Sequence, residues 1–284
     1  MPPGERRGLW LAVAAVATFS TSPVLMLLAD PLSPYEKTFW RMLAGALTVL
    51  LLATLQGRLP RYERSDPVRF VLFGLVTGLH FLGYIAALSF TTIAHALTVT
   101  YTAPIFVTLF SAWFLKEPIA SRKYVGIVVV LVGIAVLVGF EPALDRRMLI
   151  GDGLALISAI TFGLYSVIGR SQRKRYPLFT YAFATYAAAG LWLLPTALAR
   201  WTPAGYGLRQ VGALFVSGAL PLGIGHTLYN AAIRRTHATY VNLIATQEVT
   251  GGVLLGALML GQTPTVNSLV GAAITLAGIA IVLL

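Results

Sequence analysis

The sequence predicts an all-α integral membrane protein with ten transmembrane helices, arranged as two inverted-topology repeats of five helices each. Composition, the number of long apolar segments and an internal repeat predict this fold. Hydrophobic residues make up 57% of the 284 residues and charged residues only 11%, which leaves too little polar surface to solvate a soluble globule. The net charge of +11 does not predict nucleic-acid binding, because the basic residues fall in short loops between apolar segments.

Ten apolar segments approach the length of about 20 residues that a helix needs to cross the hydrocarbon core. Turn-forming residues separate them, as at Asp30-Pro31 and Glu141-Pro142. Most of the loops are too short to fold alone, so no soluble catalytic domain is expected. The segments run approximately over 8–28, 35–56, 68–89, 93–115, 122–139, 152–170, 178–199, 210–232, 238–260 and 266–284.

A shift of 145 residues aligns the two halves of the chain without a gap. We therefore expect a first five-helix repeat over residues 1–140 and a second over 146–284, which together form one unit. Because five is an odd number of crossings, the second repeat enters the membrane from the opposite side. The matched pairs include Gly8 with Gly153, Tyr84 with Tyr229, Gly126 with Gly271 and Gly133 with Gly278.

Lysine and arginine are distributed unequally between the two sets of loops. Fifteen of the 21 basic residues fall on the side that carries both chain ends, which predicts that both termini are cytoplasmic, since cytoplasmic loops collect positive charge. We assign the other six to the opposite side; they are Lys37, Arg41, Arg146, Arg147, Arg200 and Arg209.

Glu248 is the only acidic residue well inside an apolar segment, and Gln247 precedes it. A carboxylate at that depth is costly unless it faces protein or water, so it is a functional candidate by default. It could bind a substrate ammonium group or couple transport to protons. The alternative is a protonated or hydrogen-bonded packing group.

Aromatic and hydrogen-bonding residues recur at helical spacing on other segments. His80 and Tyr84 are four residues apart and share a helix face, and Tyr84 and Tyr229 are expected in opposite halves of the membrane. Pro104 removes a helix hydrogen bond and predicts a bend near the middle of the fourth segment. Each tyrosine alone could serve only packing, but one cavity that holds several is the favoured interpretation. The candidate pocket residues are His80, Tyr84, Thr98, Tyr101, Phe162, Tyr165, His226, Tyr229, Asn230, Gln247 and Glu248.

No catalytic or metal-binding motif accompanies these residues. Cysteine is absent, the four histidines are scattered, and no phosphate-binding glycine loop is present. We therefore expect no enzyme activity, no metal and no cofactor. The glycines at 126 and 133 and their repeat partners are interpreted as packing faces, since glycine in an apolar span permits close helix contact.

The motifs resemble those of the EamA-type members of the drug/metabolite transporter superfamily. The first repeat has Tyr101-Thr102-Ala103-Pro104-Ile105-Phe106 running into Leu115-Lys116-Glu117-Pro118, and the second has Gln247-Glu248-Val249 running into Leu260-Gly261-Gln262. The chain is most similar to the bacterial aromatic amino-acid exporters of that family. Val249 stands where the family has a proline, so the sequence leaves open whether the helix bends beside Glu248. Gln262 stands where an acid is common in the family.

The resemblance implies a basket of ten helices, with the cavity lined by helices 1, 3, 4, 6, 8 and 9 and with helices 5 and 10 at the periphery. It implies an inner-membrane secondary transporter that exports amino acids, aromatic ones included, or similar small metabolites by alternating access. A proton-coupled multidrug exporter of aromatic cations is the alternative, because aromatic walls suit flat apolar groups and flat cations equally. The partners are then a small-molecule substrate and the lipid bilayer, and a monomer is plausible.

Overall fold

The computed structural model describes residues 2–63, 66–91, 93–138, 146–260 and 266–283. These residues form helices and connecting turns, and no strand occurs among them. Seven helices are long and apolar enough to cross a membrane, and the shorter apolar helices Ala103–Leu115, Lys123–Val136 and Leu269–Leu283 supply three more crossings. The predicted fold class is thus confirmed. Gln262 and the Glu141-Pro142 turn lie outside the described residues.

The two repeats use the same succession of crossings. The first contains α1 (Pro3–Phe19), α2 (Ser22–Leu28), α3 (Pro34–Leu55), α4 (Asp66–Ala87), α5 (Ile93–Thr100), α6 (Ala103–Phe110), η1 (Ser111–Leu115) and α7 (Lys123–Val138). The second contains α8 (Arg146–Ser171), η2 (Gln172–Lys174), α9 (Leu178–Ala199), η3 (Pro203–Gly205), α10 (Leu208–Ser217), η4 (Gly218–His226), α11 (Thr227–Ile233), α12 (Ala238–Ala245), α13 (Glu248–Leu260) and α14 (Val266–Leu283).

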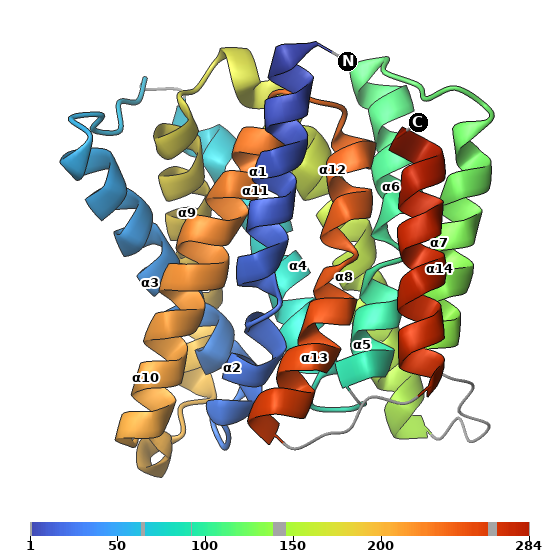
Figure 1. The fold of residues 1–284 in the computed structure, drawn as a ribbon. Coiled ribbons are helices and arrows are strands. Elements are labelled where there is room, and N and C mark those ends of the chain that lie inside the picture. Colours follow the sequence, from blue (N-terminus) through green and yellow to red (C-terminus); the bar gives the residue numbers. More distant parts are fainter. Residues whose placement is uncertain (1, 64–65, 92, 139–145, 261–265, 284) are drawn as a thin grey trace.

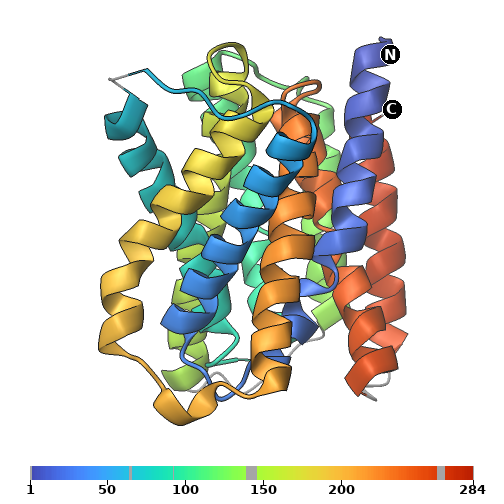
Figure 2. The same ribbon diagram turned by 90° about the vertical axis from the view of Figure 1, so that its left-hand side faces the viewer.

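The repeats run in opposite directions through the bundle. In Figure 1, α1 descends from the end that carries the N-terminus, whereas α8 rises from the opposite end. Figures 1 and 2 both place the N- and C-termini at the same end of the bundle. We call this the terminal end and the opposite one the distal end.

Two crossings are interrupted at positions that the 145-residue shift relates. The chain leaves the helix at residues 101–102, between α5 and α6, and at residues 246–247, between α12 and α13. The first break precedes Pro104, as the sequence predicts. The second occurs without a proline, so the bend that the sequence left in doubt beside Glu248 is present. At each break a threonine hydroxyl bonds a backbone carbonyl three residues earlier, Thr102 to Val99 and Thr246 to Leu243, which offers the backbone an alternative to the helix.

The helices α7 and α14 pack closely against each other at the edge of the bundle (Figure 1). A Cβ atom on Gly133 would lie 2.5 Å from the backbone nitrogen of Thr275, and one on Gly278 would lie 2.6 Å from that of Val130. Only glycine therefore permits this approach. The predicted packing faces and the peripheral position of these two helices are confirmed.

Two basic residues that sequence analysis assigned to the distal loops are buried instead. Arg41 is 2% exposed and Lys37 is 4% exposed, and both belong to α3. The helix begins at Pro34, where Ser33 and Glu36 cap each other. Arg41 consequently lies about two turns inside the bundle rather than at its surface.

Candidate functional site

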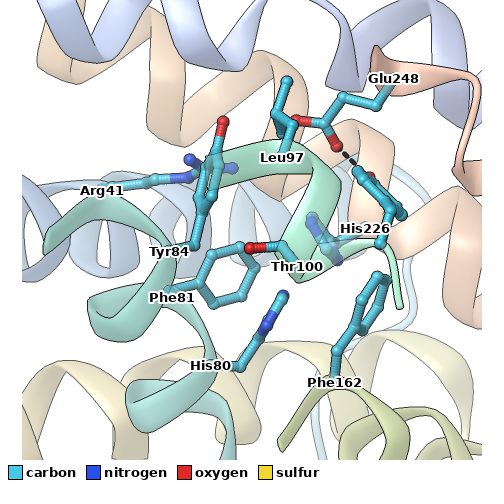
Figure 3. Close-up of a pocket in the computed structure, with 10 residues that line it drawn as sticks. Arg41, His80, Phe81, Tyr84, Leu97, Thr100, Phe162, His226 and Glu248 are labelled. Carbon is cyan, nitrogen blue, oxygen red and sulfur yellow. Dashed lines mark hydrogen bonds between the residues drawn. The ribbon is translucent and has the colours of Figure 1, made fainter. Parts of the chain in front are cut away.

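A small pocket lies at the centre of the bundle, where residues of both repeats meet (Figure 3). The enclosed space measures about 20 Å³, which is room for about one water molecule. The centre is therefore closed in this structure. The lining residues are Arg41, His80, Phe81, Tyr84, Leu97, Thr100, Tyr101, Phe162, His226 and Glu248.

The carboxylate of Glu248 lies where the two helix breaks meet. Glu248 is the first residue of α13 and is 7% exposed. The hydroxyl of Tyr101, in the other break, donates a hydrogen bond to its Oε2 atom. The first turn of a helix has free N–H groups and a positive partial charge, which favour a carboxylate. The hydroxyl of Tyr101 and the N-terminus of α13 thus stabilise the carboxyl group of Glu248 in an otherwise apolar centre.

Arg41 is the second ionisable residue of the pocket, and sequence analysis missed it. Its Nη1 atom donates to the Oγ atom of Ser22 over 2.7 Å, and its guanidinium carbon lies 4.9 Å from the centre of the Phe81 ring. Within the described residues, no carboxylate forms an ion pair with it. The signal that could have found Arg41 is its position inside the predicted segment 35–56, about two turns after the Ser33-x-x-Glu36 capping box.

Aromatic rings form the opposite wall of the pocket. The rings of His80 and Phe162 stack with centres 4.4 Å apart, and those of Phe81 and His226 meet edge to face at 4.7 Å. The Nδ1 atom of His80 lies 2.9 Å from the Oγ atom of Ser158, which fixes the orientation of this ring. The wall therefore offers a rigid apolar surface beside two ionisable side chains.

A layer of neutral hydrogen bonds separates the pocket from the terminal end. The hydroxyl of Tyr229 lies 2.6 Å from the Oγ atom of Ser166 and accepts a bond of 3.2 Å from Asn242. Asn230 donates over 2.6 Å to the hydroxyl of Tyr165. Tyr229 and Asn230 follow His226 by about one helical turn, so this layer is adjacent to the pocket lining.

The predicted site residues fall into four groups. Six line the pocket: His80, Tyr84, Tyr101, Phe162, His226 and Glu248. Three belong to the neighbouring layer: Tyr165, Tyr229 and Asn230. Gln247 instead lines a surface cavity with Trp10 and Leu276, and the side chain of Thr98 lies outside the described part of the chain.

Each end of the bundle has its own cavity. The terminal cavity measures about 980 Å³ and the distal one about 310 Å³. On α4, Tyr84 precedes Ile85, which lines the distal cavity; on α11, Tyr229 follows Leu228, which lines the terminal cavity. The two tyrosines that the repeat relates thus stand on opposite sides of the centre.

A polar network ties helices together at the terminal end. Arg170 donates to the carboxylate of Glu117 and to the carbonyl oxygen of Ile233, the latter over 2.7 Å, and Arg173 reaches the same carboxylate over 3.3 Å. Burial alone would raise the pKa of Glu117, but the hydrogen bond from Arg170 and the two positive charges hold that pKa below its ordinary value. Glu117 is therefore ionised at neutral pH and holds η1 against α8.

A second network closes the distal end. The carboxylate of Glu36 accepts bonds of 2.8 Å from the backbone nitrogen of Thr202 and from the hydroxyl of Tyr206. Lys37 contacts Asp30 at 2.5 Å. These contacts join the start of α3 to the segment before α10 and to the end of α2.

A profile of the EamA-like transporter family matches residues 6–139 and again residues 149–284. The chain belongs to this family. The resemblance to the drug/metabolite transporter superfamily is thereby confirmed, and the two matches coincide with the two repeats. The protein is a multi-pass membrane transporter of small molecules.

Several relatives are similar to this EamA-like transporter over most of their length. The pseudopaline exporter CntI of Pseudomonas aeruginosa (strain PAO1) is 29% identical over 83% of this chain and 81% of its own. The uncharacterized transporter YoaV of Bacillus subtilis is 23% identical over 84% and 83%. The S-adenosylmethionine uptake transporter of Rickettsia felis is 22% identical over 75% and 71%.

A solved crystal structure resembles this EamA-like chain in fold. The TM-score is 0.80 at 20% identity, and the match covers 97% of this chain and 96% of the other. At this level of identity the likeness shows the shared fold alone.

We predict that Tyr84→Ala and Tyr229→Ala each lower the flux of radiolabelled phenylalanine in reconstituted vesicles by roughly tenfold, which corresponds to about 1.4 kcal/mol of barrier. The reason is that each ring lies between the centre and one cavity. Expression and monodispersity should stay near wild type. Tyr124→Ala, at a half-exposed site on the peripheral helix α7, is the control. Flux that falls only in proportion to the amount of folded protein would make both tyrosines packing residues.

Proposed function

We propose that the protein is a secondary transporter of the inner membrane that exports amino acids, aromatic ones included, or similar small metabolites by alternating access. The observation that carries this proposal is the central pocket, in which Glu248 from one repeat and Arg41 from the other meet among aromatic rings. Such a pocket combines an acidic group, a basic group and a flat apolar wall. These are the features that a zwitterion with an apolar side chain requires.

The candidate residues divide into binding and gating roles. Glu248 is assigned to the substrate ammonium group, with Tyr101 holding its carboxylate in place. His80, Phe162 and His226 are assigned to the substrate side chain, since their rings form the apolar wall. The residues assigned to gating are Tyr84 on the distal side and Tyr165, Tyr229 and Asn230 on the terminal side.

Alternating access is supported by the two interrupted crossings and the two end cavities. Discontinuous helices at the interface of inverted repeats form the binding sites of many secondary transporters. With the repeats bounded at 1–140 and 146–284, rocking of one against the other would separate either the Glu117 network or the Glu36 network. The closed centre then corresponds to a state between the two openings.

The alternative substrate, an aromatic cation, is disfavoured by Arg41. A guanidinium group in a pocket of low dielectric repels a second positive charge strongly. The terminal cavity adds to this repulsion, because seven basic residues and no acidic residue of the described part of the chain line it: Arg7, Arg58, Arg61, Arg173, Lys174, Arg234 and Arg235. An amino acid, which carries no net charge, avoids this penalty.

We place the terminal end, with both termini, in the cytoplasm. The basic residues of the terminal cavity favour this orientation, since short cytoplasmic loops collect lysine and arginine.

In the cysteine-free chain, we expect a cysteine at Ala204 to react with an impermeant reagent added to whole cells. A cysteine at Gln56 should react only after permeabilisation. The reverse pattern would invert the orientation.

The proposed substrate class is tested by flux in proteoliposomes with a panel of radiolabelled amino acids and one cationic dye. We expect flux of amino acids, aromatic ones included, and none of the dye.

Glu248→Gln keeps the size and hydrogen bonding of the side chain but removes its ability to ionise. It should weaken the apparent affinity for amino acids by roughly tenfold or more, because a hydrogen bond to a charged group contributes about 1.5–3 kcal/mol.

The matched control is Glu63→Gln, which removes a carboxylate from an exposed loop. It should leave affinity and rate unchanged. Wild-type affinity and rate in Glu248→Gln would make Glu248 a structural residue. Flux of the dye without flux of any amino acid would instead favour the multidrug alternative.

A further inference from the structure

We propose that Arg41 binds the carboxylate of the substrate, so that the site selects compounds in which a carboxylate and an ammonium group are close together. This inference rests on the proposed function and narrows its substrate to the α-amino-acid zwitterion. It assigns a role to a residue that neither the repeat nor the family motifs single out.

The first support is that no carboxylate of the described residues contacts the guanidinium group of Arg41 directly. Arg41 is 98% buried in a membrane-spanning helix, and its hydrogen bond to Ser22 involves a neutral hydroxyl. Its Nε atom has no hydrogen-bond partner among the described residues. Buried charges in proteins are normally paired and hydrogen-bonded, because an incompletely compensated charge in low dielectric costs several kcal/mol. A substrate carboxylate would supply the direct contact that Glu248 does not make.

The second support is what surrounds the guanidinium group. Besides Arg41 Nε, three other buried polar atoms of the pocket lining lack a partner in the described structure: the hydroxyls of Tyr84 and Thr100 and the Nδ1 atom of His226. Buried polar groups are almost always satisfied, so four unpartnered atoms around one pocket indicate a polar ligand. Figure 3 shows Arg41 and Glu248 entering from opposite sides, with Tyr84 and Leu97 between them in this view.

The third support is the internal repeat, which provides its own comparison. The 145-residue shift places Tyr186 opposite Arg41 and Ala103 opposite Glu248. Both counterparts are fully buried and neutral. The fold can therefore be built with uncharged residues at these positions, and the scaffold does not require either charge. Both charges instead converge on the one pocket.

Lys37 provides a contrast on the same helix. It is also buried, one turn before Arg41, but it contacts Asp30 at 2.5 Å and lines the distal cavity. Its charge is accounted for within the protein. Arg41 interacts electrostatically with Glu248 across the pocket, but no carboxylate of the described residues contacts its guanidinium group. A ligand carboxylate could therefore still pair with Arg41.

The chemistry of the two groups fixes the ligand class. The planar guanidinium fork binds a carboxylate through two parallel hydrogen bonds, and the carboxylate of Glu248 accepts from an ammonium group. An α-amino acid carries a carboxylate and an ammonium group on one carbon atom, so a single molecule could bind both Arg41 and Glu248. The amide of the same amino acid has lost the negative charge and should bind weakly.

The test compares two probes of the same shape: L-phenylalanine and L-phenylalaninamide. Binding is measured as ligand-induced thermal stabilisation of the purified protein, and transport as exchange in vesicles. The wild type should prefer phenylalanine to its amide by at least roughly tenfold, since hydrogen bonds to charged groups are worth about 1.5–3 kcal/mol. Arg41→Gln should abolish that preference, and Arg41→Lys, which keeps the charge without the fork, should reduce it. Lys37→Gln should preserve it.

The outcomes separate this inference from the proposed function. A wild type that moves no amino acid would overturn the proposed function and this inference with it. Equal binding of phenylalanine and its amide by a wild type that transports phenylalanine would overturn the inference alone. So would an unchanged preference in folded Arg41→Gln or Arg41→Lys. If neither variant folds, the wild-type comparison of the two probes still decides.

Discussion

The hydrogen bond from Tyr101 to the carboxylate of Glu248 joins the two interrupted crossings at the centre of the bundle. A carboxyl group there needs polar partners, because the surrounding apolar bundle supplies no water. The helix break at residues 246–247 provides the N-terminus of α13, and the break at 101–102 provides the tyrosine. Both breaks thus serve one buried group. The two helix breaks also border the central pocket, which Arg41 and the aromatic rings line.

The arrangement around this centre is symmetrical in shape and asymmetrical in charge. Tyr84 and Tyr229 stand on opposite sides of the pocket, and a cavity lies beyond each. A polar network closes each end, built on Glu117 at one and Glu36 at the other. A polar closure at each end fits the alternating access that we propose, in which the two ends open in turn. The charges, by contrast, lie at one central position, as expected of a single binding site.

The fold was largely predictable because lipid imposes simple rules. Apolar length located every crossing, and the 145-residue repeat predicted their inversion and the glycine contact between α7 and α14. The site was less predictable. Arg41 was grouped with the distal charges although it falls inside the predicted segment 35–56, because the distribution of charges assigns a side of the membrane and not a depth. The break beside Glu248 was left in doubt because hydroxyl-to-carbonyl bonds can interrupt a helix without proline. Gln247 belongs to the helix break before α13 and lines a different cavity from Glu248, which adjacency in the sequence does not reveal.

The central claim is that substrate binds between Arg41 and Glu248, at the interface of the two repeats. An experimental structure of the wild-type protein with bound L-phenylalanine tests this most directly. The account predicts ligand density in an enlarged central pocket, with the carboxylate within hydrogen-bond distance of Arg41, the ammonium group near Glu248 and the ring against Phe162. Ligand density confined to either end cavity, with the central pocket still closed and Arg41 still bound only to Ser22, would contradict it.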